Sequence, residues 1–191
     1  MVKWFILFTT LLIAGCSTAP PIKNVSGQSV FFPAENKMIY FPPCTDASGL
    51  KVQWLGVPAE TLREFDAIVI VATRANDGSV ARIMYDRKSF PQVWDEWIRW
   101  LQYHECAHHT LGHMLPDYPP TTMQDEWDAD CIATKTLREE GVSWSIVYLY
   151  ARVFLKARSD THGDIDDRLN SMQQCYNAGI AQLVEQRLGK A

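Results

Sequence analysis

The stretch PQVWDEWIRWLQYHECAHHTLGHM, residues 91–114, marks the change from strand-like to helical sequence in this chain. Pro91 suits the first position of a helix. Large apolar and imidazole side chains then recur every three or four residues: Trp97, Trp100, Leu101, His104 and His108. This spacing places them on one helical face, so the stretch predicts a helix from residue 91 to about 114, ended before Pro116.

Upstream of this helix the sequence is typical of short strands. Apolar runs at 30–32 and 38–41 predict a hairpin. Residues 66–73 have the composition of a buried strand, and 80–86 alternate in polarity. Because the turn sequence Asn-Asp-Gly at 76–78 separates these two runs, we expect them to pair as antiparallel strands.

Downstream the sequence is helical. The predicted helices cover 122–140, ended by Gly141, then 143–158, and 165–188 with an interruption near Gly179. A short helix is also predicted to end near 62–64. Since strands precede helices instead of alternating with them, the predicted fold class is α+β, with small antiparallel hairpins followed by a helical core.

The first sixteen residues, MVKWFILFTTLLIAGC, are typical of a bacterial lipoprotein signal. Residues 1–15 would be removed and Cys16 would be lipidated; the alternative is an ordinary cleaved signal peptide. We interpret 16–29 as the lipidated cysteine with a linker and 30–191 as one domain. Ser17 after the cysteine favours the outer membrane of the bacterial envelope, with the domain facing the periplasm.

The net charge indicates which partners the protein can bind, and the cysteine content indicates whether it forms disulfides. The formal net charge is −4 and no basic cluster is present, which argues against a nucleic-acid partner. The predicted mature chain has four cysteines: Cys44, Cys106, Cys131 and Cys175. Export to an oxidising compartment allows two disulfides in any of three pairings, and buried free thiols are the alternative.

Residues 104–108, HECAH, form an HExxH motif. Histidines four residues apart project from adjacent helical turns, so His104 and His108 can bind one Zn²⁺. Glu105 lies beside them, where it can act as the general base. Cys106 faces away from the metal, His113 is expected to be structural, and His109 is expected to lie beside the metal site or at the surface.

A zinc hydrolase needs a third protein ligand. The metzincin pattern is absent because Leu111 and Met114 stand where it requires Gly and His. On the next predicted helix, Glu126 and Asp130 are four residues apart and share a face. One carboxylate could bind the zinc while the other accepts the N–H of a ligand histidine, which is the gluzincin arrangement.

Three segments, HECAHHTLGH, EWDADCIATKTLREEGVSW and DTHGDIDDRL, are similar to the HtpX and CAAX-prenyl-protease type of gluzincin peptidase, over roughly residues 80–175. The resemblance implies a zincin-like catalytic core with Glu126 as third zinc ligand and Asp130 as its partner. It also implies that His162 approaches the active site, polarising the substrate or capping the zinc. Arg168 would anchor that segment or stabilise the oxyanion. Gly163 departs from the family's proline, and the membrane helices of its integral members are missing.

These features predict a zinc-dependent endopeptidase acting on envelope proteins. His104, His108 and Glu126 would hold Zn²⁺, and Glu105 would take the proton from the attacking water. Residues 80–86 would offer a strand edge to an extended substrate. One alternative is a metal-containing lipoprotein that binds or chaperones proteins with little proteolysis, and another is a closed, purely structural zinc site.

Overall fold

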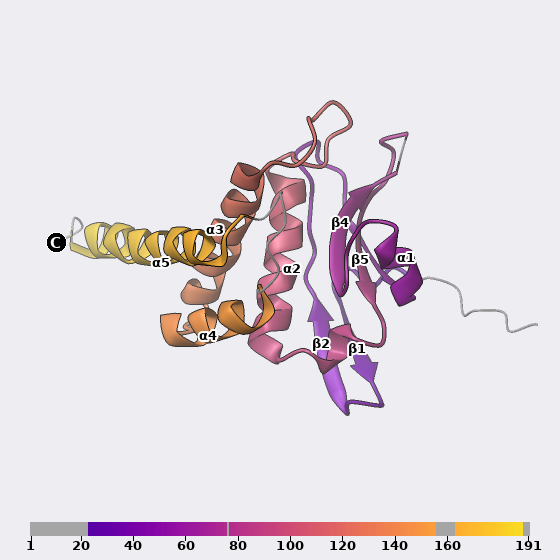
Figure 1. Cartoon of the computed structure of the whole chain (residues 1–191), viewed down its shortest axis with the longest axis horizontal. Coiled ribbons are helices and arrows are strands. Elements are labelled where there is room, and N and C mark those ends of the chain that lie inside the picture. Colours follow the sequence, from indigo (N-terminus) through magenta and orange to yellow (C-terminus); the bar gives the residue numbers. More distant parts are fainter. Residues whose placement is uncertain (1–22, 76, 156–162, 189–191) are drawn as a thin grey trace, which may run out of the picture.

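A strand-rich half and a helical half follow one another along the chain, so the predicted α+β class is confirmed (Figure 1). The computed structural model describes residues 23–75, 77–155 and 163–188. Strands β1 (Gln28–Phe32) and β2 (Lys37–Phe41) form the antiparallel hairpin predicted from the two apolar runs. No helix in the described ranges is long and apolar enough to cross a membrane.

The second sheet is mixed and has the order β3-β5-β4. Strands β4 (Ile70–Arg74) and β5 (Ala81–Asp86) are antiparallel, as predicted. Strand β3 (Gln53–Val57) was not predicted; it pairs parallel to β5. The short helix α1 (Ala59–Arg63) follows β3 and begins the return path to β4. Strand β5 therefore lies in the middle of the sheet, and the prediction that it offers a free edge to substrate is wrong.

Helix α2 (Asp95–Thr110) lies between this sheet and the other large helices (Figure 1). It is shorter than predicted at both ends, because Pro91 belongs to a separate 3₁₀ turn, Phe90–Gln92, and the chain leaves the helix after Thr110. Trp97 and Trp100 are buried in the main core, with stacked rings 4.3 Å apart. This apolar face fixes the helix against its neighbours, while its last turns carry the HExxH residues.

Helix α3 (Met123–Glu139) begins and ends at the signals that the sequence contains. Thr122 is its N-cap in a reciprocal capping box with Asp125, and Gly141 follows its end in the left-handed region at φ 86°. Helix α4 (Trp144–Phe154) is shorter than predicted. Helix α5 (Ile165–Leu188) runs through Gly179 as one element, so the predicted interruption is wrong.

Two disulfides connect these elements. Cys44 is bonded to Cys106 of α2, and Cys131 of α3 is bonded to Cys175 of α5. The structure thus selects one of the three pairings that the sequence allowed. Cysteine pairs of this kind are typical of an oxidising, extracytoplasmic compartment.

The folded part begins earlier than the predicted linker boundary at residue 29. The Val25 amide donates a hydrogen bond to the Trp54 carbonyl, and Asn24 accepts one from the Trp54 amide. Val25 is buried. The predicted signal peptide at 1–15, the lipidation site Cys16 and the predicted site residue His162 lie outside the described residues.

Candidate metal centre

Two buried histidines face each other across one turn of α2. The Nε2 atoms of His104 and His108 are 3.2 Å apart, and less than a tenth of either residue is exposed. The spacing of four residues brings the two rings to one face of the helix, as the motif predicts. Two imidazole nitrogens at this separation can share one cation.

The carboxylate of Glu126 completes a triangle with these two nitrogens. One of its oxygens lies 3.3 Å from His104 Nε2 and the other 3.5 Å from His108 Nε2. The ligands of a tetrahedral zinc ion, with bonds of about 2.0–2.1 Å, lie about 3.3–3.4 Å from one another. The triangle therefore has the donor chemistry and the size for one ion, and it is the only such group of three or more donors in the described part of the chain.

Asp130 and Arg168 lie behind His104, on the side away from this triangle. Asp130 Oδ1 is 2.9 Å from His104 Nδ1. The guanidinium of Arg168, on α5, donates two hydrogen bonds of 2.8 Å to the two carboxylate oxygens of Asp130. All three side chains are buried, so Arg168 holds Asp130 and Asp130 holds the imidazole of His104.

His113, which the sequence predicts to be structural, lies behind the second histidine, because the chain does not continue as the straight helix that was expected. The helix ends at Thr110, and Gly112 takes a left-handed conformation at φ 85°, so the chain turns back. His113 Nδ1 comes to 3.1 Å from His108 Nδ1. A glycine directly after the periodic stretch is a helix-end signal, and it is the feature from which this turn could have been predicted.

Glu105 is also buried, and it connects α2 to the sheet. Its Oε2 atom accepts a hydrogen bond of 2.5 Å from the Ala72 amide of β4. This amide belongs to the edge of β4 that faces away from β5. Glu105 thus lies between the histidine pair and the outer edge of β4, which has no strand partner among the described residues.

Electrostatics at the site favour one positive charge. Burial lowers the pKa of His104, but hydrogen bonds with Asp130 and Glu126 outweigh it and raise the pKa to about 10. Burial and the charge of His104 lower the pKa of His108 to about 3. Burial raises the pKa of Asp130, but the His104 hydrogen bond and the Arg168 charge hold it below its usual range. The carboxylates therefore stabilise a cation at the place where the three donor atoms converge.

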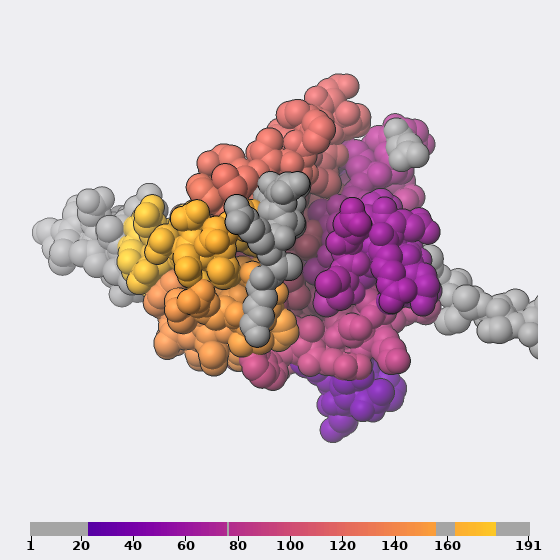
Figure 2. Space-filling view, in the orientation of Figure 1, coloured from indigo at the N-terminus to yellow at the C-terminus, as the bar shows by residue number. Residues whose placement is uncertain are grey.

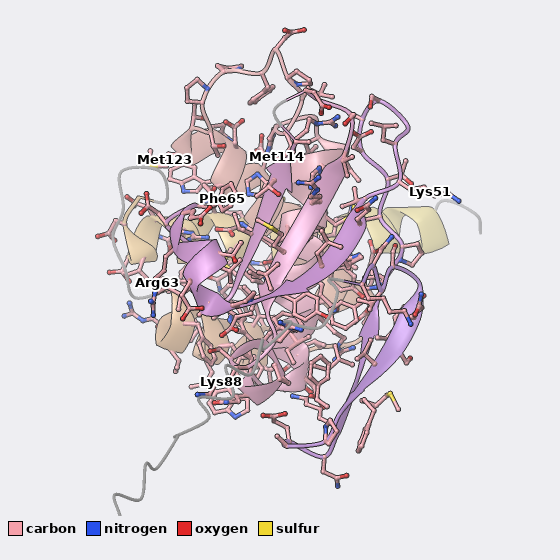
Figure 3. All side chains as sticks on the ribbon, turned by 90° about the vertical axis from the view of Figure 1, so that its right-hand side faces the viewer. Lys51, Arg63, Phe65, Lys88, Met114 and Met123 are labelled. Carbon is pink, nitrogen blue, oxygen red and sulfur yellow. A yellow bond between two sulfur atoms is a disulfide. The ribbon has the colours of Figure 1, made fainter. Side chains whose placement is uncertain are left out.

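The site opens into a cleft of about 550 Å³. One wall is the segment from Phe65 to Ala72, and the other includes Phe154 and Arg168. In Figure 2 this cleft lies between the purple surface of the sheet side and the orange and yellow surface of α4 and α5. Phe65, in the turn after α1, and Met114, in the turn after α2, are labelled in Figure 3 and both line it. His104, Glu105, His108 and Glu126 all border the cleft.

The remaining polar residues of the HExxH helix have other partners. Cys106 is in a disulfide and is therefore no metal ligand. His109, expected near the surface or beside the metal, is instead buried, with Nε2 2.9 Å from the Arg82 carbonyl of β5. The His109 side chain thus connects α2 to β5 of the sheet.

The chain was compared with models of protein families, with curated proteins and with solved structures, and none of the three comparisons found a match.

Proposed function

We propose that the protein is a zinc-dependent endopeptidase that hydrolyses peptide bonds of bacterial envelope proteins. The triangle of His104, His108 and Glu126, with Glu105 beside it on the same cleft, is the observation that carries this proposal. Two histidines and one glutamate are the ligand set of many catalytic zinc sites. Three protein donors leave a position for water, whereas a structural zinc site is closed by four.

The zinc ion and the protein side chains would have different roles in peptide-bond hydrolysis. Zinc would supply a Lewis acid that activates water and polarises the scissile carbonyl. Glu105 would take a proton from the attacking water and pass it to the leaving amine. Asp130 would fix the tautomer of His104 by accepting its Nδ1 hydrogen, so that Nε2 is directed at the metal.

Strand β4 is the proposed docking edge for an extended substrate. Its outer edge has no strand partner in the described part of the chain, and the Ala72 amide on that edge reaches Glu105. A peptide added antiparallel or parallel to β4 would bring its backbone past the metal. This replaces β5, whose two edges are both paired.

The compartment is part of the same proposal. The two disulfides support an extracytoplasmic location. We propose that Cys16 carries the lipid anchor to the membrane, that the substrates are proteins on the periplasmic side, and that nucleic acid is not a partner.

Replacing Glu105 with Gln tests the assignment of the base. The amide keeps the shape of the side chain but cannot take a proton, so we expect zinc binding to persist and hydrolysis to fall by about 10²-fold or more. The measurement is cleavage of casein by the purified domain, with zinc content determined on the same samples and a chelator-treated sample as the blank.

Glu126→Ala is the matched control, because it removes a zinc ligand from the same site. It should lose zinc and activity together. Hydrolysis by Glu105→Gln at the wild-type rate would refute the base assignment. A wild-type protein that binds zinc but cleaves no unfolded protein would favour the alternative of a binding or chaperone module.

A further inference from the structure

We propose that His113 is a positioning residue that orients His108 toward the metal and raises the zinc affinity of the site. The inference rests on the proposed metal site. It concerns a residue outside the HExxH helix, on the loop between α2 and α3.

The hydrogen bond between the two rings determines which nitrogens carry protons. His108 Nε2 faces Glu126 and His104, so Nε2 is the nitrogen directed at the metal. A neutral imidazole that binds metal through Nε2 carries its proton on Nδ1. His108 would then donate to His113 Nδ1, which lies 3.1 Å away. His113 in turn must carry its proton on Nε2.

Asp125 faces that proton and is itself held in place. Its Oδ1 atom lies 3.4 Å from His113 Nε2 and accepts a hydrogen bond of 2.5 Å from the Tyr118 hydroxyl. Its Oδ2 atom accepts a hydrogen bond of 2.7 Å from the Thr122 amide, within the capping box of α3. Asp125 and His113 are both buried. Its partners restrict the Asp125 carboxylate to one position. The carboxylate can therefore orient the ring of His113, and His113 can orient the ring of His108.

The two zinc-binding histidines are therefore supported in equivalent ways by one helix. Asp130 of α3 contacts His104 directly, whereas Asp125 of α3 acts on His108 through His113. Glu126, the third ligand, lies between these two aspartates in the sequence. Helix α3 thus supplies one ligand and the support for both others. Partners of this kind typically change metal affinity by about 10–100-fold.

Three variants of the mature protein test this role: His113→Leu, His113→Gln and His109→Leu. The readout is zinc affinity, measured by competition with a chromophoric chelator, after circular dichroism has shown that each variant is folded. We expect His113→Leu to bind zinc about 10–100-fold more weakly than wild type. His113→Gln should recover most of that loss, because its amide oxygen can accept from His108 and its amide nitrogen can donate to Asp125.

His109→Leu is the matched control, since it also removes a buried imidazole from this region but one that contacts β5. It should lower stability while leaving zinc affinity near the wild-type value. Equal affinities for wild type and His113→Leu would overturn the inference, and so would a His113→Gln variant as weak as His113→Leu. Failure of the wild-type protein to bind zinc would instead overturn the proposed function.

Discussion

Arg168 and Asp130 form a buried ion pair that keeps a carboxylate ionised beside His104. The guanidinium donates two hydrogen bonds to this one side chain, and neither residue is appreciably exposed. The resemblance to gluzincin peptidases implied that Arg168 either anchors its segment or stabilises an oxyanion. The observed contacts support the anchoring role, because the guanidinium is directed at Asp130.

Replacing Arg168 with Met should lower the free energy of unfolding by about 3 kcal/mol, because buried Asp130 loses the guanidinium that donates two hydrogen bonds to it. The measurement is urea denaturation of the zinc-free protein. Arg152→Met is the matched control: its ion pair with Asp166 is exposed and screened by solvent, so we expect a much smaller loss of stability. Similar losses in the two variants would contradict this account of Arg168.

At the scale of elements, helix α3 supplies Glu126 to the ligand triangle and also the carboxylates that contact His104 and His113. It begins at a reciprocal capping box, and that cap contains Asp125, the residue behind His113. Four residues after Glu126, one helical turn later, Asp130 contacts His104. The start of this helix therefore determines where three of the site's carboxylates lie.

Thr122→Ala should lower the free energy of unfolding by about 1 kcal/mol. The Thr122 hydroxyl accepts a hydrogen bond from the Asp125 amide, one of the helix-terminal N–H groups that have no partner within the helix. Thermal or urea denaturation measures the change. Ser143→Ala provides the comparison: Ser143 is the N-cap of α4 and makes no side-chain capping bond. If Ser143→Ala destabilises the protein as much as Thr122→Ala, the capping box is not the source of the stability.

At the scale of the whole molecule, the disulfides link the segments that build the site. One joins the segment after β2 to the HExxH helix, and the other joins α3 to α5, the helix that carries Arg168. Their half-cystines span 62 and 44 residues along the chain. Closing loops of such lengths restricts the unfolded chain strongly.

Replacing both Cys131 and Cys175 with Ala should lower the free energy of unfolding by about 2–4 kcal/mol, and so should the same change at Cys44 and Cys106. The losses should be similar, because the difference in loop length corresponds to only about 0.3 kcal/mol of closure entropy. Urea denaturation with and without reductant measures both effects. An unchanged midpoint after complete reduction of the wild-type protein would contradict the prediction.

The sequence by itself determined the features that depend on residues near one another along the chain. The spacing of His104, Glu105 and His108 on a helix, the Gly141 end of α3 and the order of strands and helices could all be predicted from local patterns. Such patterns follow from the geometry of a single helix or strand, so they persist whatever the rest of the molecule does.

The tertiary structure decided which distant residues meet. Only packing shows that β3 pairs with β5, that Cys131 bonds Cys175, that Arg168 reaches Asp130 and that His113 turns back onto His108. These contacts depend on the relative placement of whole elements, and neither the spacing of residues nor local propensity encodes that placement. The ligand triangle depends on both local sequence and tertiary packing. The spacing along α2 brings its two histidines together, and the packing of α3 against α2 brings Glu126 next to them.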